Sequence, residues 1–237
     1  MYITRFYAIV KGMLYDFHTH TFHSDGELSP VELVHRAFVN GYAAIAITDH
    51  IAVGSLSRVI AEISADCALA RKYWDIMAIP GVELTHLPPQ AISDAARKAK
   101  ELGAWLVVVH GESPIEPVPR GTNLAAVKSR YVDILAHPGL ITPEEVNLAI
   151  KNGVFIELSG RRGHCTTNPH VAIVCRELGA RLLANSDAHD EDDLLTPARA
   201  KDILRQAGVS TRHSQQILKD NPLLLLEKMK KSASTSR

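Results

Sequence analysis

The stretch LYDFHTHTFHSDGELSPVELVHRAFVNGYAAIAITDH, residues 14–50, decides the fold. It begins with a short apolar run, passes through an amphipathic segment and ends with a second apolar run. Ser29 and Pro30 are typical of a helix start, and Gly41 is typical of a helix stop. The stretch therefore predicts a strand, a helix and a second strand, which is the repeating unit of a parallel sheet.

The same alternation continues along the chain. Apolar or β-branched runs predict strands at 14–18, 43–48, 76–83, 105–110, 133–137, 154–158 and 181–185. Amphipathic segments predict helices at 30–40, 56–72, 89–102, 122–129, 142–152, 169–178 and 195–207. Because no composition boundary interrupts these repeats, we predict a single α/β domain with parallel strands over residues 14–230. An open sheet and a closed barrel would give the same pattern.

The two ends of the chain fall outside the alternation. Residues 1–13 precede the first strand, and we interpret them as an N-terminal extension or as an upstream alternative to a start at Met13. A further helix is predicted at 211–230. The polar residues 231–237 are predicted to form a disordered tail.

Composition excludes several classes of protein. The 46% hydrophobic content excludes intrinsic disorder, and 26 basic against 26 acidic residues argue against a strongly basic nucleic-acid surface. No apolar run approaches the roughly 18 residues that a membrane span needs, so no membrane partner is expected. The 3 cysteines show no CxxC spacing, which favours a reducing, cytoplasmic setting. The unusual feature is the 12 histidines.

Side chains that bind metals fall at the carboxyl ends of the predicted strands, which meet on one face in parallel α/β folds. His18 and His20 follow the first strand, and side chains two positions apart on a strand point to the same side. Asp187 and His189 repeat this spacing at the last strand, and Glu83 has two oxygens that can bridge two cations. A histidine at one strand end is commonly structural, but the joint pattern predicts a polynuclear metal site. The predicted ligands are His18, His20, Asp25, His50, Glu83, His110, His137, Asp187 and His189.

The remaining histidines divide into two groups. We interpret three of them as residues at the rim of the site that contact substrate, namely His23, His86 and His164. The others are expected to be structural or solvated, namely His35, His170 and His213.

Taken in order, these motifs resemble the PHP (polymerase and histidinol phosphatase) family over about residues 14–207. The resemblance rests on Asp-Phe-His-Thr-His-Thr, Ser-Asp-Gly, Ile-Thr-Asp-His, Gly-Val-Glu, His137-Pro138 and Ser-Asp-Ala-His. Val-Val-Val-His-Gly-Glu resembles the stand-alone, histidinol-phosphatase-like members. The resemblance implies a distorted (β/α)7 TIM-like barrel with a trinuclear metal site at the carboxyl ends of its strands.

The resemblance also implies how three divalent ions, of zinc, manganese or iron, would be shared among the ligands. The first would take His18, His20, Glu83 and Asp187. The second would take Glu83, His110 and His137, and the third Asp25, His50 and His189. Some family members have histidine at the position of Asp25, so the choice of the third ion is the most open.

Clustered divalent ions acidify a bound water and neutralise phosphate oxygens, which favours phosphoester hydrolysis. We predict an enzyme that hydrolyses a small-molecule phosphomonoester through a metal-bridging hydroxide, with histidinol phosphate as the first substrate that the resemblance implies. Arg161 or Arg162 is predicted to bind the phosphate, with Arg161 preferred. Asp187 or His189 is predicted to protonate the leaving alkoxide. Asp49 is predicted to orient a ligand.

Two alternatives stay open at this point. The first is a metal-dependent phosphodiesterase or exonuclease that acts on short oligonucleotides or nucleotides, and the second is a non-catalytic PHP scaffold module. The neutral charge disfavours long nucleic acid, because such binding needs several phosphate contacts. The absence of a GxSxG motif disfavours a serine nucleophile. The sequence specifies neither the metal nor the oligomeric state.

Overall fold

The computed structural model describes the backbone of residues 14–235 and the side chains of residues 14–230. The predicted N-terminal extension, residues 1–13, lies outside the described residues, as do residues 236–237.

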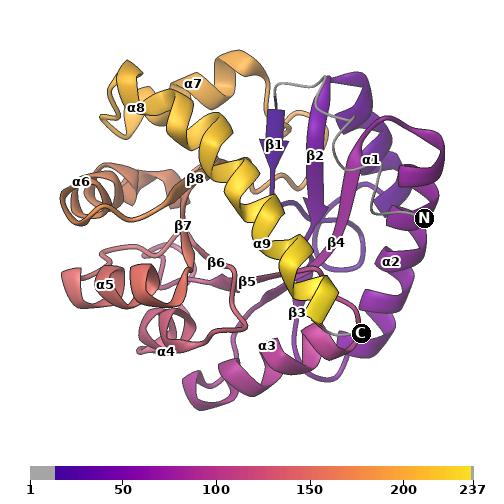
Figure 1. Cartoon of the computed structure of the whole chain (residues 1–237), viewed down its shortest axis with the longest axis horizontal. Helices are drawn as coiled ribbons and strands as arrows, with labels where there is room; N and C mark the ends of the chain where they lie inside the picture. Colours follow the sequence, from indigo (N-terminus) through magenta and orange to yellow (C-terminus); the bar gives the residue numbers. More distant parts are fainter. Residues whose placement is uncertain (1–13, 236–237) are drawn as a thin grey trace.

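All strand pairs of the described chain are parallel, and the strands form one sheet in the order β1-β2-β4-β5-β6-β7-β8 (Figure 1). The short strand β3 pairs with β4 beside this path. The predicted α/β fold with parallel strands is therefore confirmed. The strands are β1 Leu14–Asp16, β2 Tyr42–Ile47, β3 His50–Ile51, β4 Met77–Leu84, β5 Leu106–His110, β6 Ile134–Ala136, β7 Phe155–Ser159 and β8 Leu182–Asn185.

The sheet curves until its first and last strands meet. Thr19 and Ala188, which follow β1 and β8, form a parallel bridge, and the backbone N–H of His20 donates to the carbonyl of Ala188 at 2.8 Å. The backbone N–H of Asp187 donates to the carbonyl of His18 at 3.0 Å. The sheet is thus a nearly closed barrel, and it closes at the end where the strands finish.

Seven helices cover the outside of the barrel, and their starts follow the predicted chemistry (Figure 1). Thr142 and Glu145 form a capping box at the start of the helix Pro143–Asn152. At the first helix only half of that motif is present, because Ser29 caps the backbone while Glu32 pairs with Arg36 instead. The helices are α1 Pro30–Val39, α2 Leu56–Tyr73, α3 Ile92–Glu101, α4 Thr122–Lys128, α5 Pro143–Asn152, α6 Asn168–Leu178 and α7 Pro197–Gln206.

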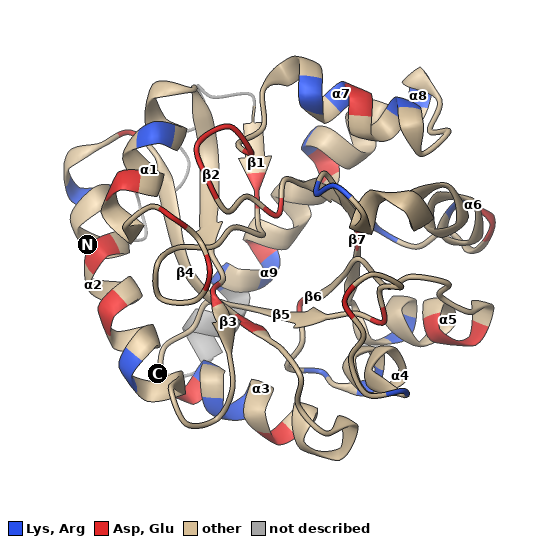
Figure 2. Ribbon diagram, turned by 180° about the vertical axis from the view of Figure 1, so that it is seen from behind, with Lys and Arg blue, Asp and Glu red and all other residues tan. Residues whose placement is uncertain are grey.

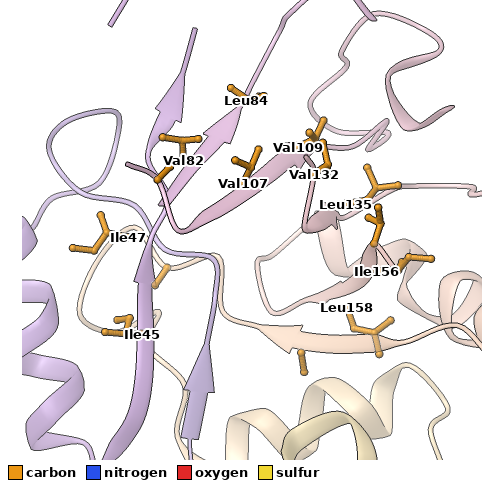
Figure 3. Close-up of a cluster of buried hydrophobic side chains, with 14 of the residues drawn as sticks. Ile45, Ile47, Val82, Leu84, Val107, Val109, Val132, Leu135, Ile156 and Leu158 are labelled. Carbon is orange, nitrogen blue, oxygen red and sulfur yellow. The ribbon is translucent and has the colours of Figure 1, made fainter. Parts of the chain in front are cut away.

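Alternate residues of each strand build two separate cores. In β5, Val107 and Val109 face the helices, and Figure 3 shows them within the outer cluster. Leu106 and Val108 belong to the second cluster, which fills the barrel. His110 continues this inward register at the end of the strand. The same alternation that packs the barrel therefore directs polar side chains into its mouth.

The C-terminal segment closes the other end of the barrel. The predicted helix at 211–230 is divided into α8 Thr211–Gln215, a π-helical turn Gln216–Asp220 and α9 Asn221–Thr235. Helix α9 crosses the barrel in Figure 1, and Leu225 and Met229 belong to the inner cluster. Helix α9 continues to Thr235, within the segment 231–237 that was predicted to be a tail. No helix among the described residues is long and apolar enough to span a bilayer.

Asp133, which directly precedes β6, holds α9 against the barrel. Its Oδ1 lies 3.1 Å from Nζ of Lys228 on α9, and its Oδ2 accepts hydrogen bonds from Lys100 and from the backbone of Val107. Asp133→Asn is expected to lower the free energy of unfolding by about 2 kcal/mol, because two partly buried ammonium groups lose their counter-charge. Urea unfolding measures this loss. The exposed pair on α7 supplies the control Asp202→Asn, and an equal effect of the two variants would contradict the assignment.

The same contact should make stability depend on pH. Burial acts to raise the pKa of Asp133, but the charges of Lys100 and Lys228 outweigh burial and hold the pKa below its usual value. Because the folded pKa is the lower one, the carboxylate stabilises the fold at neutral pH, and this contribution is lost as the pH falls below about 4. The stability difference between wild type and Asp133→Asn should therefore shrink in acid. A difference that stays constant there would refute this.

Candidate metal centre

Glu83 lies at the centre of the barrel mouth. It ends the inward-facing register of β4, its side chain is fully buried, and its carboxylate is surrounded by five imidazoles. The closest is that of His50, which pairs with Glu83 in the register of β3 and β4 and whose Nδ1 lies 2.6 Å from Oε2. The other ring nitrogens lie 3.3 to 3.8 Å from a Glu83 oxygen, and they belong to His18, His20, His110 and His137.

The carboxylate of Asp187, which follows β8, lies close to three of these five imidazoles. Its Oδ1 lies 3.3 Å from Nε2 of His20 and 3.8 Å from Nε2 of His18. Its Oδ2 lies 3.7 Å from Nε2 of His137. The pair His18 and His20 after β1 therefore meets Asp187 after β8, at the point where the barrel closes.

A third group gathers around Asp25, in the loop after β1. Its Oδ1 lies 3.2 Å from Nε2 of His189, 3.7 Å from Nε2 of His50 and 3.8 Å from Nδ1 of His20. All nine predicted ligands are thus brought together. Clusters that could hold an ion include Glu83 with His110 and His137, and Asp25 with His20, His50 and His189. In Figure 2, which views the end opposite α9, acidic segments lie in the loops around this mouth.

The buried polar atoms of this cluster fit divalent cations. Both ring nitrogens of His20 and His110 are buried without a hydrogen-bond partner among the described residues, as is Oε1 of Glu83, while Oε2 has the close contact with His50 given above. Nε2 of His18 and Nε2 of His189 are likewise buried without such a partner among the described residues. Because buried polar groups are normally paired, and because neutral imidazole and carboxylate are ligands of borderline divalent metals, these atoms point to bound ions.

Comparison with known proteins agrees with this geometry. A model of the PHP domain matches residues 16–114. An uncharacterized protein of Methanocaldococcus jannaschii is 46% identical over 218 residues, which cover 92% of this chain and 100% of that protein. A Caldanaerobacter subterraneus protein named "Probable phosphatase" is 31% identical over 194 residues, which cover 75% of this chain and 76% of that protein. The chain belongs to the PHP family.

The PHP fold is also seen in a solved structure. A Listeria monocytogenes protein, described as a candidate histidinol phosphatase, matches with a TM-score of 0.53 at 13% identity, over 75% of this chain and 96% of that one. At this identity the likeness supports the fold alone. The PHP family comprises metal-dependent phosphoesterases, so the predicted enzyme class, a metal-dependent hydrolase, is confirmed. The number of ions, their identity and the substrate stay predictions.

Backbone strain marks three strand ends of this PHP barrel. His86, His137 and Asp187 have φ values of 57°, 25° and 57°, in the left-handed region that non-glycine residues avoid. Each follows the end of a strand, and two of the three are predicted ligands. Such strain costs about 1–3 kcal/mol per residue and persists where surrounding contacts hold it, which is typical of functional sites.

Glu157, at the inward register of β7, is the main residue that the sequence prediction missed. Its Oε2 lies 2.8 Å from Nδ1 of His18 and accepts a hydrogen bond from Asn185 at 2.9 Å. Its Oε1 accepts from the backbone N–H of His137 at 3.3 Å. Glu157 thus contacts two predicted ligand residues, His18 and His137. Its position two residues after the inward-facing Phe155 was the available signal.

Asp49 acts on the loop rather than on a ligand side chain. It accepts hydrogen bonds from the backbone and the hydroxyl of Thr21, at 2.7 and 2.8 Å, and from the hydroxyl of Ser24 at 2.7 Å. The predicted orienting role is therefore indirect, because these bonds fix the segment between His20 and Asp25.

The predicted rim residues occupy different places. His23 faces Glu62 on α2, with Nδ1 3.4 Å from Oε2, and His86 is 57% exposed. His164 is buried and stacks on His137 with ring centroids 4.0 Å apart. The histidines expected to be structural or solvated contact other parts of the chain: His35 lies against Trp74, His170 bonds the carbonyl of Ile141, and His213 bonds Ser210.

The two candidate phosphate-binding arginines also differ. Arg161 lies at the mouth, where its Nη1 contacts Nδ1 of His189 and lies 3.9 Å from Asp193. Arg162 is exposed. Only the first of the pair therefore reaches a predicted ligand.

The imidazoles and carboxylates of the cluster favour one another's charged forms. Burial acts to lower the pKa of His50, but the carboxylates of Glu83 and Asp25 outweigh burial and raise it to about 9. Burial likewise acts to raise the pKa of Glu83, but the nearby imidazoles, above all that of His18, hold it well below its usual range. The central carboxylate therefore stays ionised, as cation binding requires.

Proposed function

We propose that this PHP protein is a phosphomonoesterase that hydrolyses a small phosphate ester with three divalent ions of zinc, manganese or iron, and that histidinol phosphate is the first substrate to test. The observation that carries this proposal is the set of buried, unpaired imidazole and carboxylate atoms at the barrel mouth. The ions would be held by the sets centred on Glu83, Asp187 and Asp25 described above. When bound, such ions acidify water and neutralise phosphate oxygens.

The side chains of the rim provide the remaining functions. Arg161 reaches the edge of the cluster beside His189, where its guanidinium can bind a phosphoryl oxygen. We assign protonation of the leaving alkoxide to His189 or Asp187. Glu157 and Asp49 hold the ligand residues and the loop in place. The net charge of zero supports a small substrate over a long nucleic acid.

A substrate panel on metal-loaded protein tests the proposal. Release of inorganic phosphate from histidinol phosphate or another small monoester is the expected result. Release of mononucleotides from a short oligomer, without activity on monoesters, would replace the proposal by an exonuclease. The absence of any turnover with bound metal confirmed would leave a scaffold module.

The arginine pair offers a matched test of phosphate binding. Arg161→Ala is expected to raise KM for a phosphomonoester about tenfold, because a charged hydrogen bond to the phosphate is lost. Arg162→Ala removes an exposed guanidinium of the same kind and should leave KM unchanged. Steady-state kinetics separate the two variants. Equal KM values for the two, or a larger effect at Arg162, would contradict the assignment.

A further inference from the structure

The loop after β5 is fixed to the rim of the barrel at both ends. Oε1 of Glu112 accepts hydrogen bonds from the backbone N–H groups of Gly121 and Asn123, at 2.9 and 3.0 Å. Ser113 is buried and its hydroxyl lies 2.7 Å from Nδ1 of His164. The loop is therefore held over the mouth by contacts of its own residues.

These contacts place the carboxylate of Glu116 at the mouth. Its Oε2 lies 3.7 Å from Nε2 of His164 and 4.0 Å from Nε2 of His110, and its Oε1 lies 3.8 Å from Nε2 of His86. The neighbouring Ile115 packs on Gly163, where a Cβ would collide with it. The side chain of Glu116 is 40% exposed, so a ligand in the mouth can reach it.

No lysine or arginine of the described chain lies within ion-pair distance of Glu116. Its neighbours are imidazoles, and the distances of 3.7 to 4.0 Å exceed those of hydrogen bonds. Glu116 therefore does not orient His110. The opposite nitrogen of His110, Nδ1, faces Glu83 at 3.4 Å, so the imidazole ring of this predicted ligand lies between the exposed carboxylate and the central one.

We propose that Glu116 is a specificity-determining residue that binds a positively charged group of the substrate, and that the substrate class is short-chain phosphomonoesters that carry an ammonium group. This inference rests on the proposed phosphomonoesterase function. A substrate whose phosphate lies at the cluster would place a group a few bonds away beside Glu116, where an ammonium is stabilised and a second phosphate is repelled. The carboxylate thus selects for cationic monoesters and against nucleotide chains.

Two non-hydrolysable phosphonates of equal length test this charge recognition. Calorimetry on the metal-loaded protein compares 3-aminopropylphosphonate with butylphosphonate, which differ in an ammonium and a methyl group. Wild type is expected to bind the amino compound about tenfold more tightly. Glu116→Gln should remove this preference without weakening butylphosphonate. Glu101→Gln removes an exposed carboxylate on α3 and should keep the preference.

Three results of the binding and metal measurements would overturn the inference: equal affinities in wild type, a preference that survives in Glu116→Gln, or a loss of bound metal from that variant. The last would make Glu116 a ligand, since it clusters with His50 and His110. Hydrolysis of the two corresponding phosphate esters separates this inference from the proposed function. Hydrolysis of both at equal rates refutes the inference alone, whereas a binding preference without hydrolysis of either ester supports the recognition by Glu116 and refutes the phosphomonoesterase.

Discussion

Glu83→Gln is expected to remove bound metal and to lower phosphoester hydrolysis by about a thousandfold or more, because several kcal/mol of transition-state stabilisation is lost. Glutamine has nearly the same shape, but it is neutral and its amide nitrogen cannot bind a cation. The carboxylate it replaces lies within 3.8 Å of five imidazoles, so it is shared by more predicted ligands than Asp187 or Asp25. One neutralised side chain should therefore affect more than one ion.

Elemental analysis and phosphate release from the same preparation measure both effects of Glu83→Gln. Glu101→Gln, in an exposed pair with Arg97, is the matched control and should keep metal content and rate. Circular dichroism checks that the variant is folded. A folded Glu83→Gln protein with full metal content, or with more than a tenth of the wild-type rate, would refute the central role of this carboxylate.

Glu157→Gln is expected to weaken metal binding by about 10- to 100-fold, the range typical of residues that orient metal ligands. Glu157 is a positioning residue, because it holds Nδ1 of His18 and the backbone of His137 rather than reaching the mouth. The neutral amide would keep the packing but weaken the hold on the imidazole. The expected loss of activity should therefore arise mainly from lost metal.

Metal titration distinguishes positioning from ligation at Glu157. If Glu157 positions His18, an excess of metal should restore most of the rate of Glu157→Gln, while the apparent Kd of the metal stays raised. Glu157 also falls in a cluster with His18, His137 and Asp187 that could hold an ion. A rate that excess metal does not restore would make it a ligand instead.

The sequence predicted the strands and the convergence of the nine candidate ligands well because both depend on local rules. Inward register repeats every two residues, so His110 and Glu83 could be placed at strand ends without knowledge of the sheet. Strand ends of a parallel fold converge, so these side chains had to meet. What the structure adds is distance: the nine residues, spread over more than half of the chain, meet at the barrel mouth, and five of their imidazoles lie within 3.8 Å of the Glu83 carboxylate.

Features that depend on tertiary contacts were not predictable in this way. Barrel closure rests on the bridge between Thr19 and Ala188, which no local pattern marks. The position of Glu116 depends on bonds that Glu112 makes to the far end of the loop.

The most direct test of the central claim is the metal content of purified protein measured together with its phosphomonoesterase rate, before and after chelation. The nine-residue cluster predicts about three divalent ions per chain, loss of both metal and rate with a chelator, and recovery of both when metal is returned. Hydrolysis that continues at full rate in metal-free, folded protein would contradict the account, as would a folded protein that binds no divalent ion.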